Sequence, residues 1–153
     1  MAKQITVYHG TSHAFRVEIE DFGLRVRPGK SRGTRVSLTR ELALLHASAY
    51  CAFMMLTEHL PPKALLVSAT IDERRVREGA PKNPLAGMQV GPHKAPVVGP
   101  ALVLSGGLSK DEVRLEEVDM KFLHDPEAAR RALIIFERMT DKKITVQPRR
   151  RTV

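Results

Sequence analysis

The sequence predicts one α+β domain with several short strands and two or three helices. The chain of 153 residues is long enough for a single domain with its own core. Apolar residues alternate over 63–71, which is typical of a strand, and they recur at helical spacing over 42–56 and 129–139. The sequence shows no internal repeat and no interdomain linker. We therefore expect one domain over 1–146 and a basic tail over 147–153.

The first half of the chain predicts two short strands followed by a helix and a third strand. Residues 5–8 alternate apolar and polar side chains, so we expect a strand that ends in a turn at 9–12. The pattern over 15–24 is mixed and leads into a basic loop. Residues 35–38 predict the second strand.

The helix that follows has clear start and stop signals. Thr39 is a suitable N-cap, and Glu41 places a carboxylate in the first turn, where the helix dipole favours it. Pro61 and Pro62 end the element. The alternation over 63–71 then predicts the third strand.

The segment from Gly79 to Lys110 differs in composition from the rest of the chain. It contains six of the ten glycines, half of the prolines and no acidic residue. We expect a mobile, functional loop here, with a strand over 97–104. A long strand is expected over 112–122, and Asp125 caps a last helix with Pro126 in its first turn.

The net charge is +8 and the pI is about 10.1, which favours anionic partners such as nucleic acid, a nucleotide or an acidic protein surface. Only seven Tyr and Phe residues and no Trp are present, so a platform of stacked bases is poorly supplied. The apolar stretch 42–57 is too short to span a bilayer, and the N-terminus lacks the apolar core of a signal peptide. We expect a cytoplasmic protein with no membrane partner.

Common catalytic and metal motifs are missing from the sequence. The six histidines show no helical zinc spacing, so we expect no metal site. Cys51 lies in the predicted helix and is interpreted as a small buried apolar residue. Ser105 lacks the preceding glycine of a nucleophile elbow, and no phosphate loop or dinucleotide fingerprint is found. The segment 7–12 remains, where a histidine and a glycine at a strand end leave backbone groups open to a ligand.

This segment, which contains "YHGT", resembles the first signature of the ADP-ribosyltransferase superfamily, in the branch with a His-Tyr-Glu arrangement. Residues 19–24 ("IEDFGL") look like the segment that follows it. Residues 35–52 ("RVSLTRELALLHASAYCA") are similar to the second signature, and residues 112–118 ("EVRLEEV") look like the late strand that begins with the catalytic glutamate. The resemblance covers most of the first 118 residues and implies a split β-sheet core with a few flanking helices.

The resemblance implies an NAD-dependent mono-ADP-ribosyltransferase that uses NAD as a co-substrate. Cleavage of the nicotinamide–ribose bond passes through an oxocarbenium-like transition state, which a carboxylate stabilises, and the ADP-ribose goes to a protein or nucleic-acid acceptor. The implied roles are catalysis by Glu112 and His9, ribose binding by His9, carboxamide binding by the Gly10 backbone, turn support by Thr11, pyrophosphate binding by Arg25 and Arg35, a hydrogen bond from Ser37 and nicotinamide stacking by Tyr50.

Several points depart from the family pattern or stay open. Residues 36–38 contain no aromatic side chain, which is why Tyr50 is the candidate for stacking. Lys110 stands two positions before Glu112, so arginine modification by a Glu-x-Glu motif is not supported. A register shift would replace Glu112 as the catalytic acid by one of its neighbours, Asp111, Glu116 or Glu117.

Two other functions are compatible with the same residues. One is an RNA 2′-phosphotransferase-like NAD enzyme, a branch that normally carries further Arg and His residues contacting the RNA phosphate. The other is a small basic module that binds nucleic acid or protein without catalysis. Steeply salt-dependent binding without NAD turnover would indicate this module.

Overall fold

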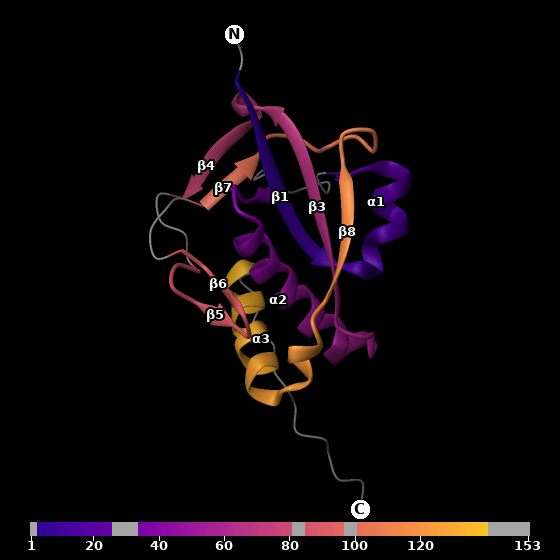
Figure 1. Ribbon diagram of the computed structural model, residues 1–153, viewed down its shortest axis with the longest axis vertical. Helices are drawn as coiled ribbons and strands as arrows, with labels where there is room; N and C mark the ends of the chain where they lie inside the picture. Colours follow the sequence, from indigo (N-terminus) through magenta and orange to yellow (C-terminus); the bar gives the residue numbers. More distant parts are fainter. Residues whose placement is uncertain (1–2, 26–33, 81–84, 97–100, 141–153) are drawn as a thin grey trace, which may run out of the picture.

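The computed structural model describes residues 3–25, 34–80, 85–96 and 101–140. These residues form a mixed α+β domain, as predicted (Figure 1). One antiparallel sheet has the order β1-β3-β8, formed by Gln4–Ser12, Lys63–Asp72 and Arg114–Asp119. A second antiparallel sheet has the order β2-β7-β4, formed by Thr34–Val36, Ala101–Leu104 and Val76–Ala80. A small hairpin joins β5 (Gln89–Val90) to β6 (His93–Lys94).

Three α-helices and three short 3₁₀ turns complete the described part of the chain. The helices are α1 (Arg16–Phe22), α2 (Arg40–Glu58) and α3 (Pro126–Thr140). The turns are η1 (His13–Phe15), η2 (Glu73–Arg75) and η3 (Lys121–His124). Among the described residues, no helix is long and apolar enough to cross a membrane.

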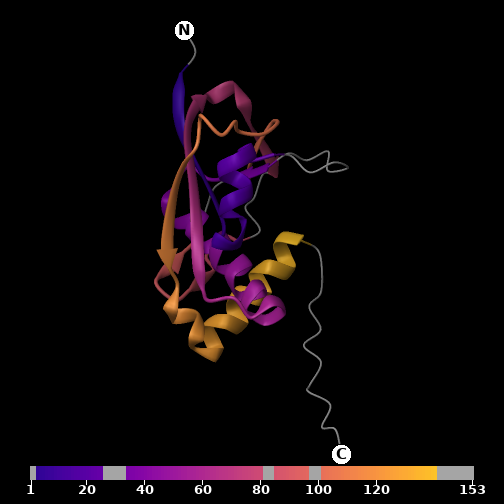
Figure 2. The ribbon, with the colours of Figure 1, turned by 90° about the vertical axis from the view of Figure 1, so that its right-hand side faces the viewer.

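The strand β3 lies at the centre of the first sheet and contributes to two separate cores. Its side chains alternate between the two faces of the sheet. Ala64 and Leu66 pack into a core with α2 and α3, whereas Leu65 and Val67 pack into a second core with Ile19 of α1 and parts of the second sheet. Figure 2 shows the first sheet edge-on, with α1 packed against it. Six of the ten residues of β3 are therefore buried, among them the apolar residues whose alternation predicts the strand.

The caps predicted for the two long helices are present. Thr39 Oγ1 accepts a hydrogen bond from Leu42 N at 3.3 Å, and Asp125 Oδ2 accepts one from Ala128 N at 3.2 Å. Each cap satisfies one backbone N–H that the first turn leaves without a partner. The two helices pack through Phe53 and Phe136, whose rings stack at 4.3 Å. Local sequence signals are sufficient to define both of these elements.

Three predicted boundaries were wrong. The strand β1 does not end in a turn at 9–12 but continues through Gly10 to Ser12. The mixed segment after it forms α1, whose outward-facing Val17 and Phe22 obscure the apolar pattern. The last strand spans Arg114–Asp119 rather than 112–122. It begins two residues later than predicted because the Glu112 carboxylate accepts a hydrogen bond from Ser109 N at 2.8 Å and closes a turn, and it ends three residues earlier because η3 follows it.

The described part of the segment 79–110 is packed rather than loosely structured, which corrects the prediction of a loop. Leu85, Val90 and Ala95 are buried in the core formed by α2 and α3. His93 on β6 lies 3.1 Å from Glu41 at the start of α2, measured from Nδ1 to Oε2. The strand predicted over 97–104 is present as β7, although residues 97–100 lie outside the described residues. The predicted basic tail also lies outside them.

The helix α2 approaches β1 at Gly10 so closely that only glycine fits there. A Cβ atom on Gly10 would lie 1.8 Å from the Ala43 carbonyl oxygen and 2.9 Å from Ala47 Cβ. The nearest of these atoms belongs to helix backbone and has no freedom to move aside. The glycine of "YHGT" is therefore required for the packing of α2 against the first sheet.

We expect Gly10→Ala to destabilise the fold by about 3 kcal/mol or more, because the helix must move away from β1 to make room for the methyl group. Urea unfolding monitored by circular dichroism measures this change. Gly87→Ala is the matched control, since Gly87 has a positive φ of 78° but open space around it. Gly87→Ala is expected to lower the free energy of unfolding only by the cost of placing an L-residue at a positive φ, about 1–2 kcal/mol. Equal stability of Gly10→Ala and the wild type would contradict the close approach.

Candidate functional site

The strand β1 pairs with Ser37, the residue directly after β2, and the two chain segments then separate. Tyr8 N donates to Ser37 O at 2.8 Å, and Ser37 N donates to Tyr8 O at 2.8 Å. In a continuous antiparallel ladder, the next pair of this kind would join Gly10 to Arg35. The isolated bridge at Tyr8 and Ser37 is instead the only pairing of the two strands among the described residues. We call the point after it the β1–β2 split.

A side chain replaces the missing backbone pair. His9 Nδ1 lies 2.8 Å from the Arg35 carbonyl oxygen. A carbonyl oxygen only accepts hydrogen bonds, so Nδ1 carries the proton. The Arg35 carbonyl thus accepts a hydrogen bond from the imidazole of His9. In a regular sheet the same carbonyl would accept one from the Gly10 N–H.

The split leaves backbone groups of Gly10 without a strand partner. Because Tyr8 directs its N–H and C=O toward β2, the alternation of the ladder directs those of Gly10 to the same side. Gly10 is buried, and no hydrogen-bond partner for it on this side is present in the described part of the chain. Buried backbone groups are almost always paired in folded proteins. The Gly10 N–H and C=O therefore offer a donor and an acceptor to a ligand.

His9 is held in one protonation state. Burial lowers the pKa of His9 below its ordinary value of 6.5, and the nearby Arg35 charge lowers it further, although the hydrogen bond to the Arg35 carbonyl opposes both effects. The ring is therefore neutral at pH 7, with its proton on Nδ1. Its Nε2 atom accepts hydrogen bonds rather than donating them.

A second histidine, His46 on α2, lies close to His9 and Arg35. It is 5% exposed, and its Nε2 atom is buried with no hydrogen-bond partner among the described residues. Burial, together with the charges of Arg35 and His9, lowers the pKa of His46 to about 3. The hydroxyl oxygen of Ser37 is likewise buried with no partner in the described part of the chain. We refer to His9, Arg35, Ser37 and His46 as the split cluster.

The split cluster combines one permanent positive charge with polar groups from three elements. Within the described residues, neither His9 nor His46 is hydrogen-bonded to a carboxylate. The Nη1 atom of Arg35 is also buried. The positive charge of the half-buried Arg35 next to two neutral imidazoles favours anions and repels cations. Three of the predicted binding residues, His9, Arg35 and Ser37, are thus brought together.

The structure does not bring Glu112 to the split cluster. Glu112 lies before β8, and β3 separates β8 from β1, which places the two strands roughly 10 Å apart. Arg75 Nη1 donates to Glu112 Oε1 at 2.6 Å, and Arg75 Nη2 donates to the Gly107 carbonyl at 2.8 Å. The bonds from Arg75 and Ser109 hold the pKa of Glu112 below its ordinary value. The described contacts of Glu112 therefore stabilise the turn before β8.

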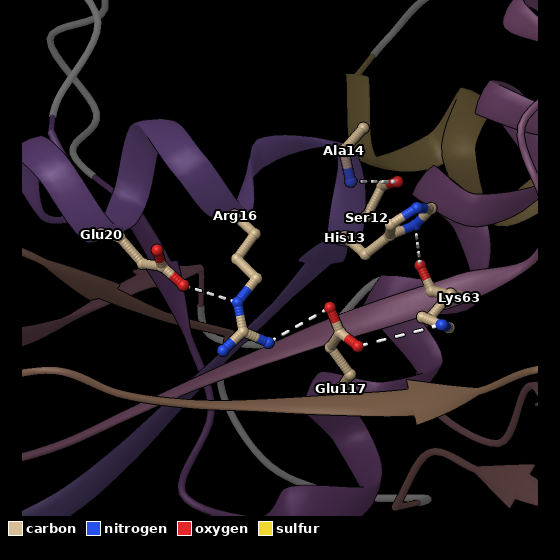
Figure 3. Close-up of polar contacts among 7 residues, drawn as sticks. All are labelled: Ser12, His13, Ala14, Arg16, Glu20, Lys63 and Glu117. Carbon is tan, nitrogen blue, oxygen red and sulfur yellow. Dashed lines mark hydrogen bonds and ion pairs between the residues drawn. The ribbon is translucent and has the colours of Figure 1, made fainter.

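The three alternative acids are also placed away from His9. Figure 3 shows Glu117 between Arg16 of α1 and Lys63 of β3, at 3.1 Å and 3.9 Å. Glu116, on the opposite face of β8, forms an ion pair with Arg40. Asp111 is exposed in the turn before the strand. The ion pair of Glu117 joins α1 to the edge of the first sheet.

The other predicted binding residues do not meet at the split cluster. Arg25 lies over the Phe22 ring at 4.4 Å and 3.7 Å from Glu18, on the exposed side of α1. Tyr50 packs edge-on against Phe136 at 5.6 Å, which gives it a role between α2 and α3. Thr11 is buried within β1. The turn that Thr11 was expected to support is closed by Ser12, whose Oγ accepts from Ala14 N at 3.2 Å (Figure 3).

Comparison with protein-family models, with curated proteins and with solved structures gives no significant match. The function is therefore inferred from the chemistry of the Gly10 backbone and of the split cluster beside it.

Two residues with a clear role in the structure, His46 and Arg75, were not among the site residues predicted from the sequence. His46 interrupts the long apolar stretch at 42–57, and a histidine inside an apolar helix face was the signal that it is buried. Arg75 is one of three neighbouring arginines, and nothing local distinguishes it as the partner of Glu112. Cys51 is buried as predicted, and burial raises the pKa of its thiol to about 12, so the thiol is unreactive.

We expect acid to destabilise the protein through His46. Its folded pKa of about 3 lies below the ordinary value of 6.5, so the unfolded chain binds this proton more readily. Stability is therefore fully present above pH 6.5 and is lost as the pH falls toward 3. At pH 5 the loss from His46 is about 2 kcal/mol relative to pH 7.

Urea unfolding at pH 7 and pH 5 measures this loss. His46→Gln is expected to remove its part of the difference, while His13→Gln serves as the control because His13 bonds to the Lys63 carbonyl at 3.0 Å outside the split cluster. An unchanged pH dependence in His46→Gln would show that His46 is not buried in its neutral form.

Proposed function

We propose that the chain is an NAD-dependent transferase of ADP-ribose that binds NAD at the β1–β2 split. The observation that carries the proposal is the pair of backbone groups on Gly10, a donor and an acceptor side by side next to a neutral His9. The family resemblance of "YHGT" and of the strand-helix unit after it supports the same site. A net charge of +8 agrees with an anionic dinucleotide and an anionic acceptor.

The groups at the split complement NAD in chemistry. A primary carboxamide has one C=O and one NH₂, which match the Gly10 N–H and C=O. In our proposal the nicotinamide carboxamide lies there, and its orientation is fixed by two hydrogen bonds to rigid backbone. His9 Nε2 accepts a hydrogen bond from a ribose hydroxyl. Arg35 neutralises charge on the pyrophosphate.

The reaction exchanges one bond at the nicotinamide ribose. The bond from C1 of the ribose to the nicotinamide nitrogen breaks, and nicotinamide leaves with the electron pair. The acceptor then forms a bond to the same carbon and gives up a proton if it carries one. Glu112 would have to exchange Arg75 for the ribose to stabilise the cation, and this catalytic role stays a prediction.

A second candidate is the RNA 2′-phosphotransferase-like NAD enzyme. The observation that favours it is the presence of Arg35 and His46 beside His9 with no carboxylate bound to either histidine in the described structure. Such a group suits a phosphate acceptor better than a hydroxyl or an amine, because phosphate is already nucleophilic and needs no base. The two candidates share the NAD site and differ in the acceptor.

We expect isothermal titration to show NAD binding to the wild type, and an affinity at least about tenfold lower for His9→Ala, which loses the hydrogen bond to the ribose. His13→Ala is the matched control, because it removes a half-buried histidine that bonds to a carbonyl elsewhere. Incubation with labelled NAD, and with either a cell lysate or an RNA carrying an internal 2′-phosphate, then identifies the acceptor.

Glu112→Gln is tested in the same assay. Because Glu112 closes a turn, we expect Glu112→Gln to lower the melting temperature. If Glu112 also stabilises the cation, as predicted, transfer by the folded protein falls by about a hundredfold or more while NAD affinity stays within a few-fold. Transfer within a few-fold of the wild type would show that Glu112 acts only in the turn. The absence of NAD binding at millimolar concentration in the wild type would contradict the proposed function itself.

A further inference from the structure

Part of one face of the first sheet is left open to solvent. In an antiparallel sheet, residues directly opposite each other on neighbouring strands lie on the same face. On the face that packs against α2, the helix meets Gly10 of β1 and Leu66 of β3. Further along the same face, Thr6, Thr70 and Arg114 are exposed. No element that the structure describes therefore covers this part of the sheet.

The side chains on this open part form a polar row across the three strands. The register places Tyr8 of β1 opposite Ser68 of β3, and Ser68 opposite Arg114 of β8. Thr6 lies opposite Thr70 in the next pair on this face, and their hydroxyl oxygens are 3.1 Å apart. We call these five residues the open sheet face. It combines aliphatic hydroxyls, one aromatic ring and one guanidinium.

The open sheet face carries a positive charge. Within the described residues, Arg114 forms no ion pair. The carboxylates nearby on the same side of the sheet are bound by arginines. Glu116 is paired with Arg40, the first residue of α2, and Asp72 is held by Arg74 at 2.7 Å. Because the whole chain also has a net charge of +8, an anionic partner fits this face better than a cationic one.

The side chains of the open sheet face match the chemistry of single-stranded nucleic acid. Every base has a face that can stack on an aromatic ring. Tyr8 is half-buried against the core beside α2, which leaves part of its ring accessible. Serine and threonine hydroxyls donate to phosphate oxygens, and an arginine such as Arg114 attracts them. A duplex keeps its bases paired and stacked, so it offers no base to the ring.

We propose that the open sheet face binds single-stranded nucleic acid, with one base on Tyr8 and the phosphate backbone along the hydroxyls and Arg114. This inference goes beyond the proposed function, because it involves neither NAD nor the residues of the split cluster. An acidic peptide would match the charge of the face, but it would leave the ring of Tyr8 without a stacking partner.

Fluorescence anisotropy of the intact protein with a labelled single-stranded RNA of about 12 nucleotides tests the proposal. We expect binding that weakens steeply with salt, because phosphate contacts release counterions. Arg114→Gln should weaken binding about tenfold and make the salt dependence shallower by about one phosphate contact. Arg138→Gln is the matched control, since Arg138 is exposed on α3 and also forms no ion pair in the described part of the chain. Equal effects of the two substitutions, or no binding by the wild type, would overturn the proposal.

A second pair of variants tests the stacked base. Tyr8→Leu removes the aromatic ring and should weaken RNA binding about tenfold, whereas Tyr8→Phe keeps the ring and should bind within a few-fold of the wild type. A polyglutamate peptide of the same charge should bind more weakly than the RNA. Binding of this peptide as tightly as the RNA would show that charge alone is recognised, which contradicts the proposal.

A third measurement needs no variant. In the backbone ¹⁵N–¹H spectrum of the wild type, the signals of Thr6, Ser68, Thr70 and Arg114 should move when RNA is added, while that of Arg138 stays in place. The sample contains no NAD, so the result is independent of the proposed function. Stationary signals on the open sheet face at saturating RNA would overturn the proposal.

Discussion

The hydrogen bond between the His9 imidazole and the Arg35 carbonyl sets the arrangement on which the rest of the site depends. It replaces the backbone pair that would otherwise join Gly10 to Arg35, so among the described residues β1 pairs with the segment that contains β2 only through Tyr8 and Ser37. The same bond fixes the proton of His9 on Nδ1. One interaction thus frees the backbone of Gly10 and determines what His9 offers to a ligand.

Gly10 meets two requirements at once. Its missing side chain admits the Ala43 carbonyl of α2, and its backbone faces β2 with no partner in the described part of the chain. The helix in turn brings His46 beside Arg35, where burial and like charge hold the ring neutral. This arrangement buries the polar atoms Ser37 Oγ and His46 Nε2 without a partner among the described residues, beside a half-buried arginine, which is costly for stability. Such a cost is expected at a binding site, where a ligand completes the missing interactions.

Local signals predicted the elements with clear boundaries, and long-range contacts decided the rest. Thr39 and Asp125 defined the two long helices through their caps, whereas Gly10 suggested a turn because its contact with α2 cannot be read locally. His9, Arg35 and Ser37 were predicted as neighbours and do meet. The assignment of catalysis to Glu112 depended on a contact between distant segments, and the structure joins Glu112 to Arg75 instead.

Amide hydrogen exchange at Gly10, measured by NMR with and without NAD, tests the split most directly. Tyr8 donates its N–H to Ser37 and serves as the internal reference. The account predicts that the Gly10 amide exchanges much faster than the Tyr8 amide in the free protein and becomes protected when NAD binds. A Gly10 amide that is as protected as that of Tyr8 without ligand would contradict it.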